Sequence, residues 1–128
     1  MKNLFYTFMF LGMVTFSCSD EENPNLPEPF QACGVDNVFE LPWIAAGIED
    51  LEKSDIGKKY SSLHSAQYGS QTVFYFGSCC PYCSMVPPSL YDCGGNKLGK
   101  FGTEGIDWEE ITNFEVIWKS SENECIFD

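Results

Sequence analysis

Three cysteines lie within five positions of one another in the chain, at Cys79, Cys80 and Cys83. Two residues separate Cys80 from Cys83, and thiols at that spacing have three common uses. They can form a reducible dithiol, clamp a metal ion or belong to a disulfide framework. The neighbouring residues and the other cysteines of the chain decide between these uses.

The letters at residues 80–83, CPYC, are identical to the motif of glutaredoxin-type redox enzymes. A catalytic dithiol of that type has its first cysteine at a helix N-terminus, where the helix dipole lowers the thiol pKa. Pro87 and Pro88 end any helix after Cys83 within about one turn. No proline follows Pro88 to form the second active-site loop of such enzymes. These departures favour a chance identity, and a thiol–disulfide oxidoreductase using Cys80 and Cys83 stays an alternative.

Metal binding and hydrolysis have less support. A structural zinc site needs further ligands, and no second pair with the spacing of Cys80 and Cys83 is present. Residues 92–96 lack the third-position acid and the distal glutamate of a calcium loop. A nucleophile needs a base, and the one histidine, His64, is expected on the surface of a strand. The sequence therefore predicts no metal site, no cofactor and no catalytic residue.

The cysteine count favours a disulfide framework. An even number of cysteines in a small exported domain is typical of such a framework. We expect the clustered cysteines to be tied to different places, because neighbouring side chains of a strand point in opposite directions. One of the cluster is expected to bond Cys93, while Cys33 and Cys125 could bond the cluster or each other. With Cys18 set aside, the candidates are Cys33, Cys79, Cys80, Cys83, Cys93 and Cys125.

The first residues have the pattern of an export signal. Lys2 precedes an apolar run, residues 4–16, that has the length of a signal-peptide core and is too short to span a bilayer. The run ends in Ser17-Cys18, which resembles the lipobox of bacterial lipoproteins. The resemblance implies that residues 1–17 are cleaved and that the acylated Cys18 attaches the chain to the lipid bilayer. An ordinary secretory signal is the alternative.

Residues 18–31 contain acids and prolines and almost no hydrophobic side chains, so they predict a flexible tether. The stretch SDEE at residues 19–22 resembles the export signal of surface lipoproteins in one Gram-negative lineage, although a plain soluble linker would look the same. The expected location is the cell envelope, as an outer-membrane lipoprotein that this signal would carry to the cell surface.

The charge of the chain excludes one class of partner. The net charge is −12, and the chain has no arginine. Such a surface repels the phosphates of nucleic acids. It also repels anionic membranes, so the expected membrane attachment is covalent.

Residues 32–128 predict one small α+β domain, an antiparallel β-meander with one main helix packed on it and stapled by disulfides. The helix begins at Pro42, which suits a first turn, and is expected to end at Gly57. Gly69-Ser70 predicts a hairpin turn, and Asp107 with Glu110 predicts the capped start of a second helix over residues 108–113. The expected strands are 60–68, 71–76, 89–93, 97–101 and 114–118.

Four short motifs occur in one order: ACGV at 32–35, LPW at 41–43, YDCGGN at 91–96 and IWK at 117–119. Together with Cys18 and the acidic tether, they resemble a family of small uncharacterised bacterial lipoproteins. Members often have a cysteine shortly after the Asp-Cys-x-Gly-Asn turn, which residues 98–100 lack. The resemblance implies lipid anchoring and export, and it implies no catalytic activity.

The leading hypothesis is therefore a lipid-anchored, non-catalytic envelope or surface module that binds a protein or glycan or supports an assembly. The first alternative is the oxidoreductase with Cys80 and Cys83. The second is a small hydrolase inhibitor that presents the loop from Cys79 to Pro88.

Overall fold

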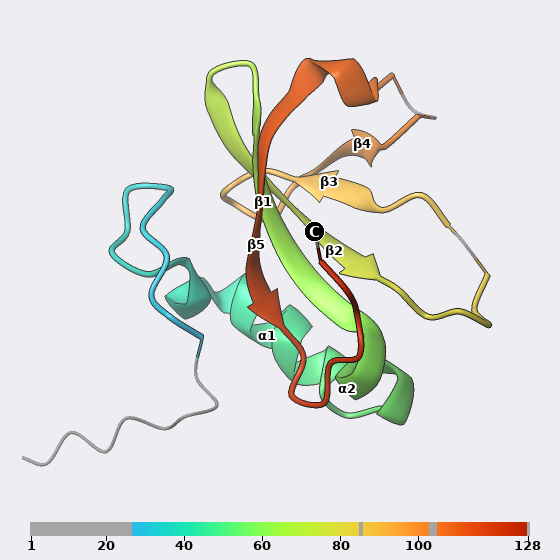
Figure 1. Ribbon diagram of the computed structural model, residues 1–128. Helices are drawn as coiled ribbons and strands as arrows, with labels where there is room; N and C mark the ends of the chain where they lie inside the picture. The colour runs from blue at the N-terminus through green and yellow to red at the C-terminus, as the bar shows by residue number, and fades with distance from the viewer. Residues whose placement is uncertain (1–26, 85, 103–104, 128) are drawn as a thin grey trace, which may run out of the picture.

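Two strands of eight residues, β1 (Ser61–Tyr68) and β2 (Gln71–Ser78), form the centre of the sheet. They are antiparallel, and Tyr68 pairs with Gln71 across the predicted hairpin turn. The sheet continues with β3 (Ser89–Tyr91) and β4 (Lys97–Lys100) beyond β2. The last strand, β5 (Ile111–Lys119), returns to pair with β1, which gives the order β4-β3-β2-β1-β5 (Figure 1).

This computed structural model describes residues 27–84, 86–102 and 105–127. The predicted α+β fold, with an antiparallel sheet, one main helix and stapling disulfides, is confirmed. Cys18 and most of the predicted tether lie outside the described residues. No helix within these ranges is long and apolar enough to cross a membrane. The helical elements are η1 (Val38–Glu40), α1 (Pro42–Leu51), α2 (Asp55–Tyr60) and η2 (Trp108–Glu110).

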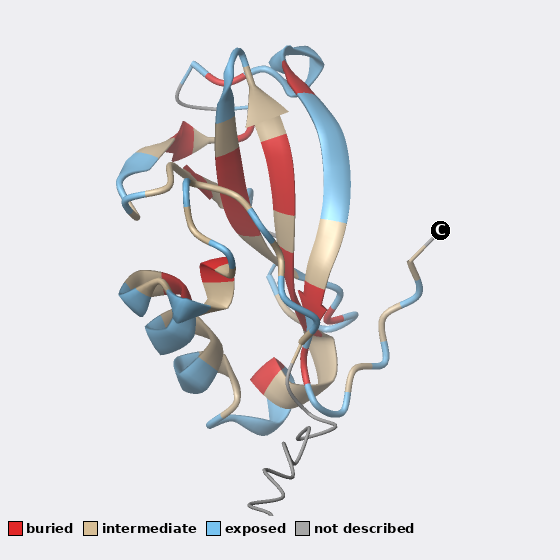
Figure 2. Cartoon of the chain, turned by 90° about the vertical axis from the view of Figure 1, so that its left-hand side faces the viewer, coloured by how far each residue is buried: buried red, intermediate tan, exposed pale blue. Residues whose placement is uncertain are grey.

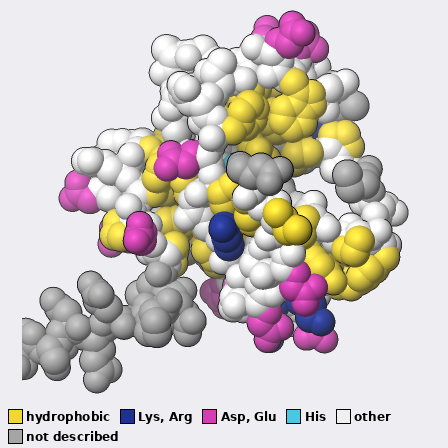
Figure 3. Space-filling model, viewed as in Figure 1, with side chains coloured by type: hydrophobic (Ala, Val, Ile, Leu, Met, Phe, Trp, Pro, Cys, Tyr) yellow, Lys and Arg dark blue, Asp and Glu magenta, His cyan; other side chains and the backbone are white. Residues whose placement is uncertain are grey.

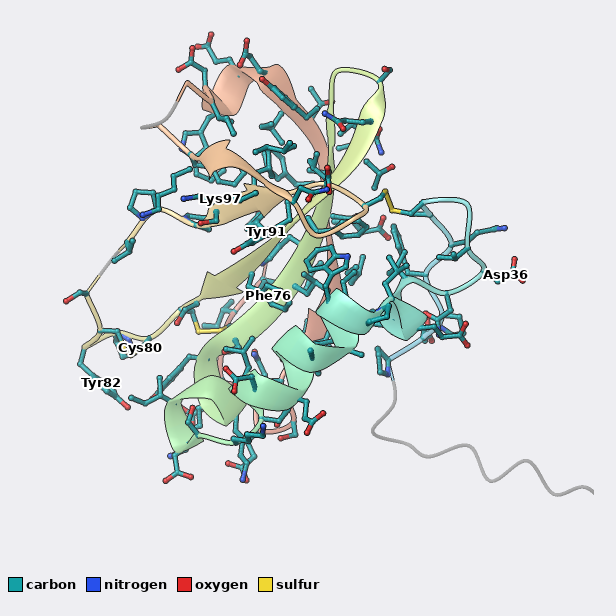
Figure 4. The ribbon with its side chains drawn as sticks, turned by 180° about the vertical axis from the view of Figure 1, so that it is seen from behind. Asp36, Phe76, Cys80, Tyr82, Tyr91 and Lys97 are labelled. Atoms are coloured by element: carbon teal, nitrogen blue, oxygen red, sulfur yellow. A yellow bond between two sulfur atoms is a disulfide. The ribbon has the colours of Figure 1, made fainter. Side chains whose placement is uncertain are left out.

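The side chains of β2 alternate between two hydrophobic clusters, as the period of a strand requires. Phe74 belongs to the cluster that includes Ile44 of α1, and Phe76 packs against that cluster. Phe76 reaches α1 at Gly47, where a Cβ atom would lie 2.7 Å from the Phe76 ring (Figure 4). Tyr75 belongs to the second cluster, on the opposite face. The helix layer therefore covers one face of the sheet and leaves the other to Tyr75 and its neighbours (Figures 1 and 4).

The prediction that the main helix ends at Gly57 is wrong. Helix α1 ends at Leu51, and Gly57 lies inside the short helix α2. The Ser54 hydroxyl caps α2 by accepting a hydrogen bond from the Gly57 N–H at 3.0 Å. Glycine is needed there because a Cβ would overlap the Leu51 carbonyl oxygen. The residue therefore permits a tight connection between two helices.

The predicted helix over residues 108–113 is also wrong beyond its first turn. Only the 3-10 turn η2 forms, and the Asp107 side chain does not cap it. Ile111 is buried, and it pairs with Tyr68 as the first residue of β5. Burial of this β-branched side chain in the sheet outweighs the local helix signal. The strand is consequently longer at its start than predicted.

Strand β3 ends before Cys93 because the chain turns at Asp92. The Asp92 carboxylate accepts hydrogen bonds from the N–H groups of Gly94 and Asn96, both at 2.9 Å. The hydrogen bonds from Asn96, the largest influence, lower the pKa of this carboxyl group. The turn places Cys93 at the end of the sheet rather than in a strand.

Candidate functional site

All six cysteines proposed for the framework are bonded. The disulfides are Cys33–Cys93, Cys79–Cys125 and Cys80–Cys83, with Cα–Cα separations of 5.6, 5.8 and 5.4 Å. Such bonds persist in oxidising compartments, so the domain is extracytoplasmic. No group of three or more potential metal ligands occurs in the part of the chain that the structure describes.

The prediction that Cys93 bonds a member of the Cys79–Cys83 cluster is wrong. Cys93 bonds Cys33 instead. The loop before η1 packs on the helix-side cluster beside the turn after β3, and both cysteines contact that cluster. The Trp43 indole N–H donates a hydrogen bond to the Cys93 carbonyl oxygen at 3.0 Å, which holds the turn against the start of α1. The contact between helix and sheet therefore decides this pairing.

The expectation that Cys79, Cys80 and Cys83 are tied to different places is also wrong. Cys80 bonds Cys83. The expectation rested on β2 continuing through the cysteines, but β2 ends at Ser78. The chain turns at Pro81 and Tyr82 and brings Cys83 back to Cys80.

Cys79 bonds Cys125, a pairing that the sequence left open. Backbone hydrogen bonds hold the segments that contain Cys79 and Cys125 against two consecutive residues, Lys59 and Tyr60. The Cys79 N–H donates to the Tyr60 carbonyl at 3.0 Å, and the Glu124 N–H donates to the Lys59 carbonyl at 2.8 Å. The C-terminal segment is therefore fixed beside the end of β2.

A pocket of about 340 Å³ lies where this segment, the ends of β1 and β2 and the loop after β2 meet. Both the Cys80–Cys83 and the Cys79–Cys125 disulfides line it. Its other walls include Ser62, His64, Tyr75, Gly77, Val86 and Phe127. Figure 4 shows Cys80 and Tyr82 on the loop that leaves β2.

His64 lies in the wall of this pocket and is half-buried, which corrects its prediction as a surface residue. Its ring stacks on Tyr75 with the centroids 4.5 Å apart, and its Nε2 lies 2.8 Å from the Ser62 hydroxyl oxygen. Gly77 leaves room for this pair, since a Cβ there would lie 3.1 Å from both polar atoms. Burial lowers the pKa of His64. Among the described residues no acid forms an ion pair with His64 to complete a catalytic triad.

An aromatic row crosses the sheet face opposite α1. We define it as the five rings His64, Tyr75, Phe101, Trp108 and Phe114. Tyr75 contacts Phe101 edge-on at 5.1 Å, and Phe101 stacks on Trp108 at 4.0 Å. Phe114 lies 6.0 Å from Trp108 and 6.2 Å from Tyr75. The buried rings thus support two outer rings, Trp108 at 52% exposed and Phe114 at 46%.

A bulge in β5 places Phe114 in the row. Between Ser65 and Gln67 of β1 the paired positions on β5 move from Glu115 to Thr112, so β5 contains one extra residue. Asn113 has a φ of 54° within this bulge. Bulges redirect side chains, and Phe114 here turns toward Tyr75 while the surrounding strand stays exposed (Figure 2).

Exposed acids lie close in the chain to the two outer rings of the aromatic row. Asp107, Glu109 and Glu110 flank Trp108 and are exposed, and the exposed Glu115 follows Phe114. Figure 3 shows hydrophobic side chains gathered at this end of the molecule with acidic side chains beside them. The surface therefore combines flat aromatic area with negative charge.

Comparisons with protein-family models, with curated proteins and with solved structures find no match to this chain. The pocket and the aromatic row are therefore the features of this chain that bear on its function. Sequence reasoning missed the roles of His64, Trp108 and Phe114. The high aromatic content was visible, but which rings meet on one face depends on strand pairing and on the bulge.

Proposed function

We propose that the protein is an exported, non-catalytic binding module that is anchored to the outer membrane through an acylated Cys18. The tether at residues 18–31 would let the domain reach a partner on the cell surface. The disulfides, which place the domain outside the cytoplasm, support export. The lipid anchor rests on the lipobox-like sequence that ends at Cys18.

The exposed end of the aromatic row is the main support for the proposed binding function. Large aromatic side chains dominate binding interfaces because they bury much area at little entropic cost. Trp108 presents about half its surface to solvent although one face stacks on Phe101. Phe114 is kept beside it by a bulge that requires a positive φ at Asn113. A fold that holds apolar rings outward in this way suits a docking surface.

The charges at this end indicate the chemistry of the partner. Four exposed acids lie next to Trp108 and Phe114 in the chain. A lysine or arginine side chain over a tryptophan ring gains about 0.5–2 kcal/mol, and neighbouring acids add attraction and faster association. We therefore assign the surface to a protein segment rich in lysine and arginine. Neither alternative suggested by the sequence, thiol–disulfide turnover or hydrolase inhibition, is needed to explain this surface.

The binding test uses a labelled lysine- and arginine-rich peptide, a matched acidic peptide and a neutral oligosaccharide, each titrated with the detergent-solubilised protein. Trp108→Ala should weaken binding of the basic peptide by roughly tenfold. Reversing the charges at Glu109 and Glu110 to lysine should weaken it without touching the buried rings, and added salt should do the same. Tyr82→Ala is the matched control, because Tyr82 is a 69% exposed aromatic outside the row.

Two outcomes would contradict the assignment. Unchanged affinity in Trp108→Ala would show that the aromatic row is not the docking surface. Binding of the oligosaccharide in place of the basic peptide would support a binding module but would show that its partner is a glycan and not a basic protein segment.

The anchor is tested separately with Cys18→Ser. We expect this variant to leave the membrane fraction or to accumulate as the uncut precursor, because the acylated atom is gone. Fractionation and the mass of the N-terminal peptide measure the result, with Ser17→Ala as the control. Membrane partition of a Cys18→Ser chain whose N-terminal peptide has been cut off would show that the chain is held by something other than a lipid on this residue.

A further inference from the structure

Independently of the docking surface, we infer that Cys80–Cys83 is an exchangeable disulfide, and that the pocket beside it receives a thiol carried on an apolar peptide segment. The two other disulfides are structural. The three disulfides differ in loop length, Cys80 and Cys83 differ in exposure, and the pocket wall beside them is apolar.

Loop length separates the three bonds. Cys33–Cys93 and Cys79–Cys125 join residues 60 and 46 positions apart, whereas Cys80–Cys83 joins residues 3 apart. A cross-link restricts the unfolded chain less when it closes a shorter loop. The Cys80–Cys83 bond therefore contributes least to holding the fold together.

The fold keeps the sulfurs of Cys79–Cys125 together even without their bond. The backbone hydrogen bonds to Lys59 and Tyr60 hold both segments in place. A thiol that opened this disulfide would leave its two sulfurs adjacent, so it would soon close again. Cys33 and Cys93 are held in the same manner by the contacts of their segments with the helix-side cluster. Cys80 and Cys83 instead lie on one loop between β2 and β3.

Exposure does not separate the two disulfides at the pocket, because Cys79 is exposed. Within the Cys80–Cys83 bond, exposure indicates which sulfur reacts. Cys80 is only 5% exposed, whereas Cys83 is half-buried at the pocket. Exchange needs an attacking thiolate to approach one sulfur while the other leaves. The geometry assigns attack to Cys83 and departure to Cys80.

The pocket favours an uncharged, apolar occupant. The described residues that line it include no aspartate, glutamate or lysine, and its apolar walls include Tyr75, Phe76, Val86, Pro88 and Phe127. The rest of the molecule contributes to a net charge of −12. An anionic thiol such as glutathione is therefore repelled at long range. The ammonium group of Lys119 lies 4.8 Å from the centroid of the Phe127 ring and interacts with that ring.

The incoming segment carries two thiols. One thiol loses its proton to solvent, and its thiolate attacks the Cys83 sulfur. The Cys80–Cys83 bond breaks, and Cys80 leaves as a thiolate that takes a proton from solvent. The second thiol of the segment ionises and attacks its own mixed-disulfide sulfur, which releases Cys83 as a thiolate that is protonated in turn. The segment is oxidised by two electrons, and the protein is reduced to the Cys80, Cys83 dithiol.

In the described residues no helix begins at Cys80 or Cys83. No helix dipole therefore stabilises either thiolate. The exchange is consequently slow compared with the turnover of a dithiol enzyme.

The first experiment maps native-state reduction. The oxidised wild-type protein is treated with increasing dithiothreitol, trapped by alkylation and analysed by peptide mass spectrometry. We expect Cys80 and Cys83 to become alkylated at a dithiothreitol concentration at least about tenfold below that needed for the other four cysteines. Reduction of all three disulfides together, or of a long-range disulfide first, would overturn the inference.

The second experiment tests the roles of the two sulfurs with the uncharged reagent dithiodipyridine. Cys80→Ser leaves Cys83 free and should release thiopyridone at least about tenfold faster than Cys83→Ser, which leaves the buried Cys80. The double variant is the control for intact long-range disulfides and should release none. Equal rates for the two single variants, or a faster Cys83→Ser, would refute attack at Cys83.

The third experiment tests the occupant with wild-type protein. A neutral peptide with leucine or phenylalanine beside its cysteine should open Cys80–Cys83 several-fold faster than glutathione, after correction for the thiolate fraction of each. Phe127→Ala should reduce that preference. Equal corrected rates for the two thiols would refute the apolar substrate class.

Discussion

At the scale of the residue, His64 shows how burial without an acidic partner lowers the pKa of a side chain. Tyr75 covers one face of its ring, Ser62 contacts Nε2, and Phe127 approaches from the C-terminal segment. No acid among the described residues pairs with it, so no ion pair there offsets the cost of charging the imidazole in the pocket wall. The neutral form is therefore the one that suits the folded protein.

This environment predicts a pH dependence with a definite sign. Burial lowers the pKa of folded His64 below its ordinary value of 6.5. The stability gained from neutral His64 is fully present above the unfolded pKa and is lost as the pH falls through the folded pKa. Wild-type protein should therefore lose more unfolding free energy than His64→Gln between pH 7 and pH 5, measured in urea.

Imidazole NMR provides the direct check, since the chain has a single histidine. The titration midpoint of the folded protein should lie below that of the urea-unfolded chain. A folded midpoint above the unfolded one would mean that an acid faces His64 and that this description of the pocket is wrong. The Asp92 carboxyl group does not interfere, because its pKa is lowered from 3.8 and lies outside the measured range.

At the scale of the element, β5 is an edge strand that carries two irregularities in its pairing with β1. An exposed straight edge invites pairing with another chain, and bulges reduce that risk by twisting the edge. In β5 the bulge at Asn113 also places Phe114 in the aromatic row. One local distortion thus protects the edge and builds the proposed docking surface.

The conformation of Asn113 can be tested by substitution. Its φ of 54° suits asparagine and glycine but costs a β-branched residue about 1–2 kcal/mol. Asn113→Val should lower the unfolding free energy by that amount in urea, whereas Asn113→Gly should leave it nearly unchanged. Thr112→Val is the matched control, because Thr112 is exposed in the same strand and has no positive φ. Equal stability of the two valine variants would show that the bulge carries no strain.

At the scale of the whole molecule, two disulfides tie the ends of the domain to the sheet. Cys33–Cys93 holds the loop before η1, and Cys79–Cys125 holds the segment after β5. A small domain buries a limited fraction of its surface, so such links make up for a modest core. The Glu52 carboxylate accepts hydrogen bonds from the N–H and the hydroxyl of Ser121, at 2.8 and 2.6 Å, which adds a further contact between the helix layer and the C-terminal segment.

The disulfides should differ in their effect on stability. The loop-closure relation gives about 4 kcal/mol for each long-range bond and about 2 kcal/mol for Cys80–Cys83. Replacing both cysteines of a long-range pair by alanine should therefore lower the unfolding free energy about twice as much as replacing Cys80 and Cys83. Urea unfolding under non-reducing conditions measures the three double variants. A larger loss for the Cys80, Cys83 variant than for the others would contradict the division into structural and exchangeable bonds.

The sequence by itself determined the fold class of this protein, α+β with disulfides. A modest strand pattern over residues 60–68, an unbroken apolar run at residues 73–76 and a hairpin turn predicted β1 and β2, Pro42 marked the start of the main helix, and the cysteine count indicated disulfides. These features are local, since each depends on a few neighbouring residues and on the period of a strand or helix. The export signal and the lipid anchor remain predictions of the sequence.

Only the tertiary structure decided which cysteines meet and which face stays open. Cys125 reaches Cys79 because β5 returns beside β1, and Cys33 reaches Cys93 because the loop before η1 packs beside the turn after β3. The unbroken apolar run in β2 indicated burial on both faces of the strand but could not show which face the helices would cover. Pairing and coverage depend on contacts between residues far apart in the chain, and their free energies are set by packing that no local pattern encodes.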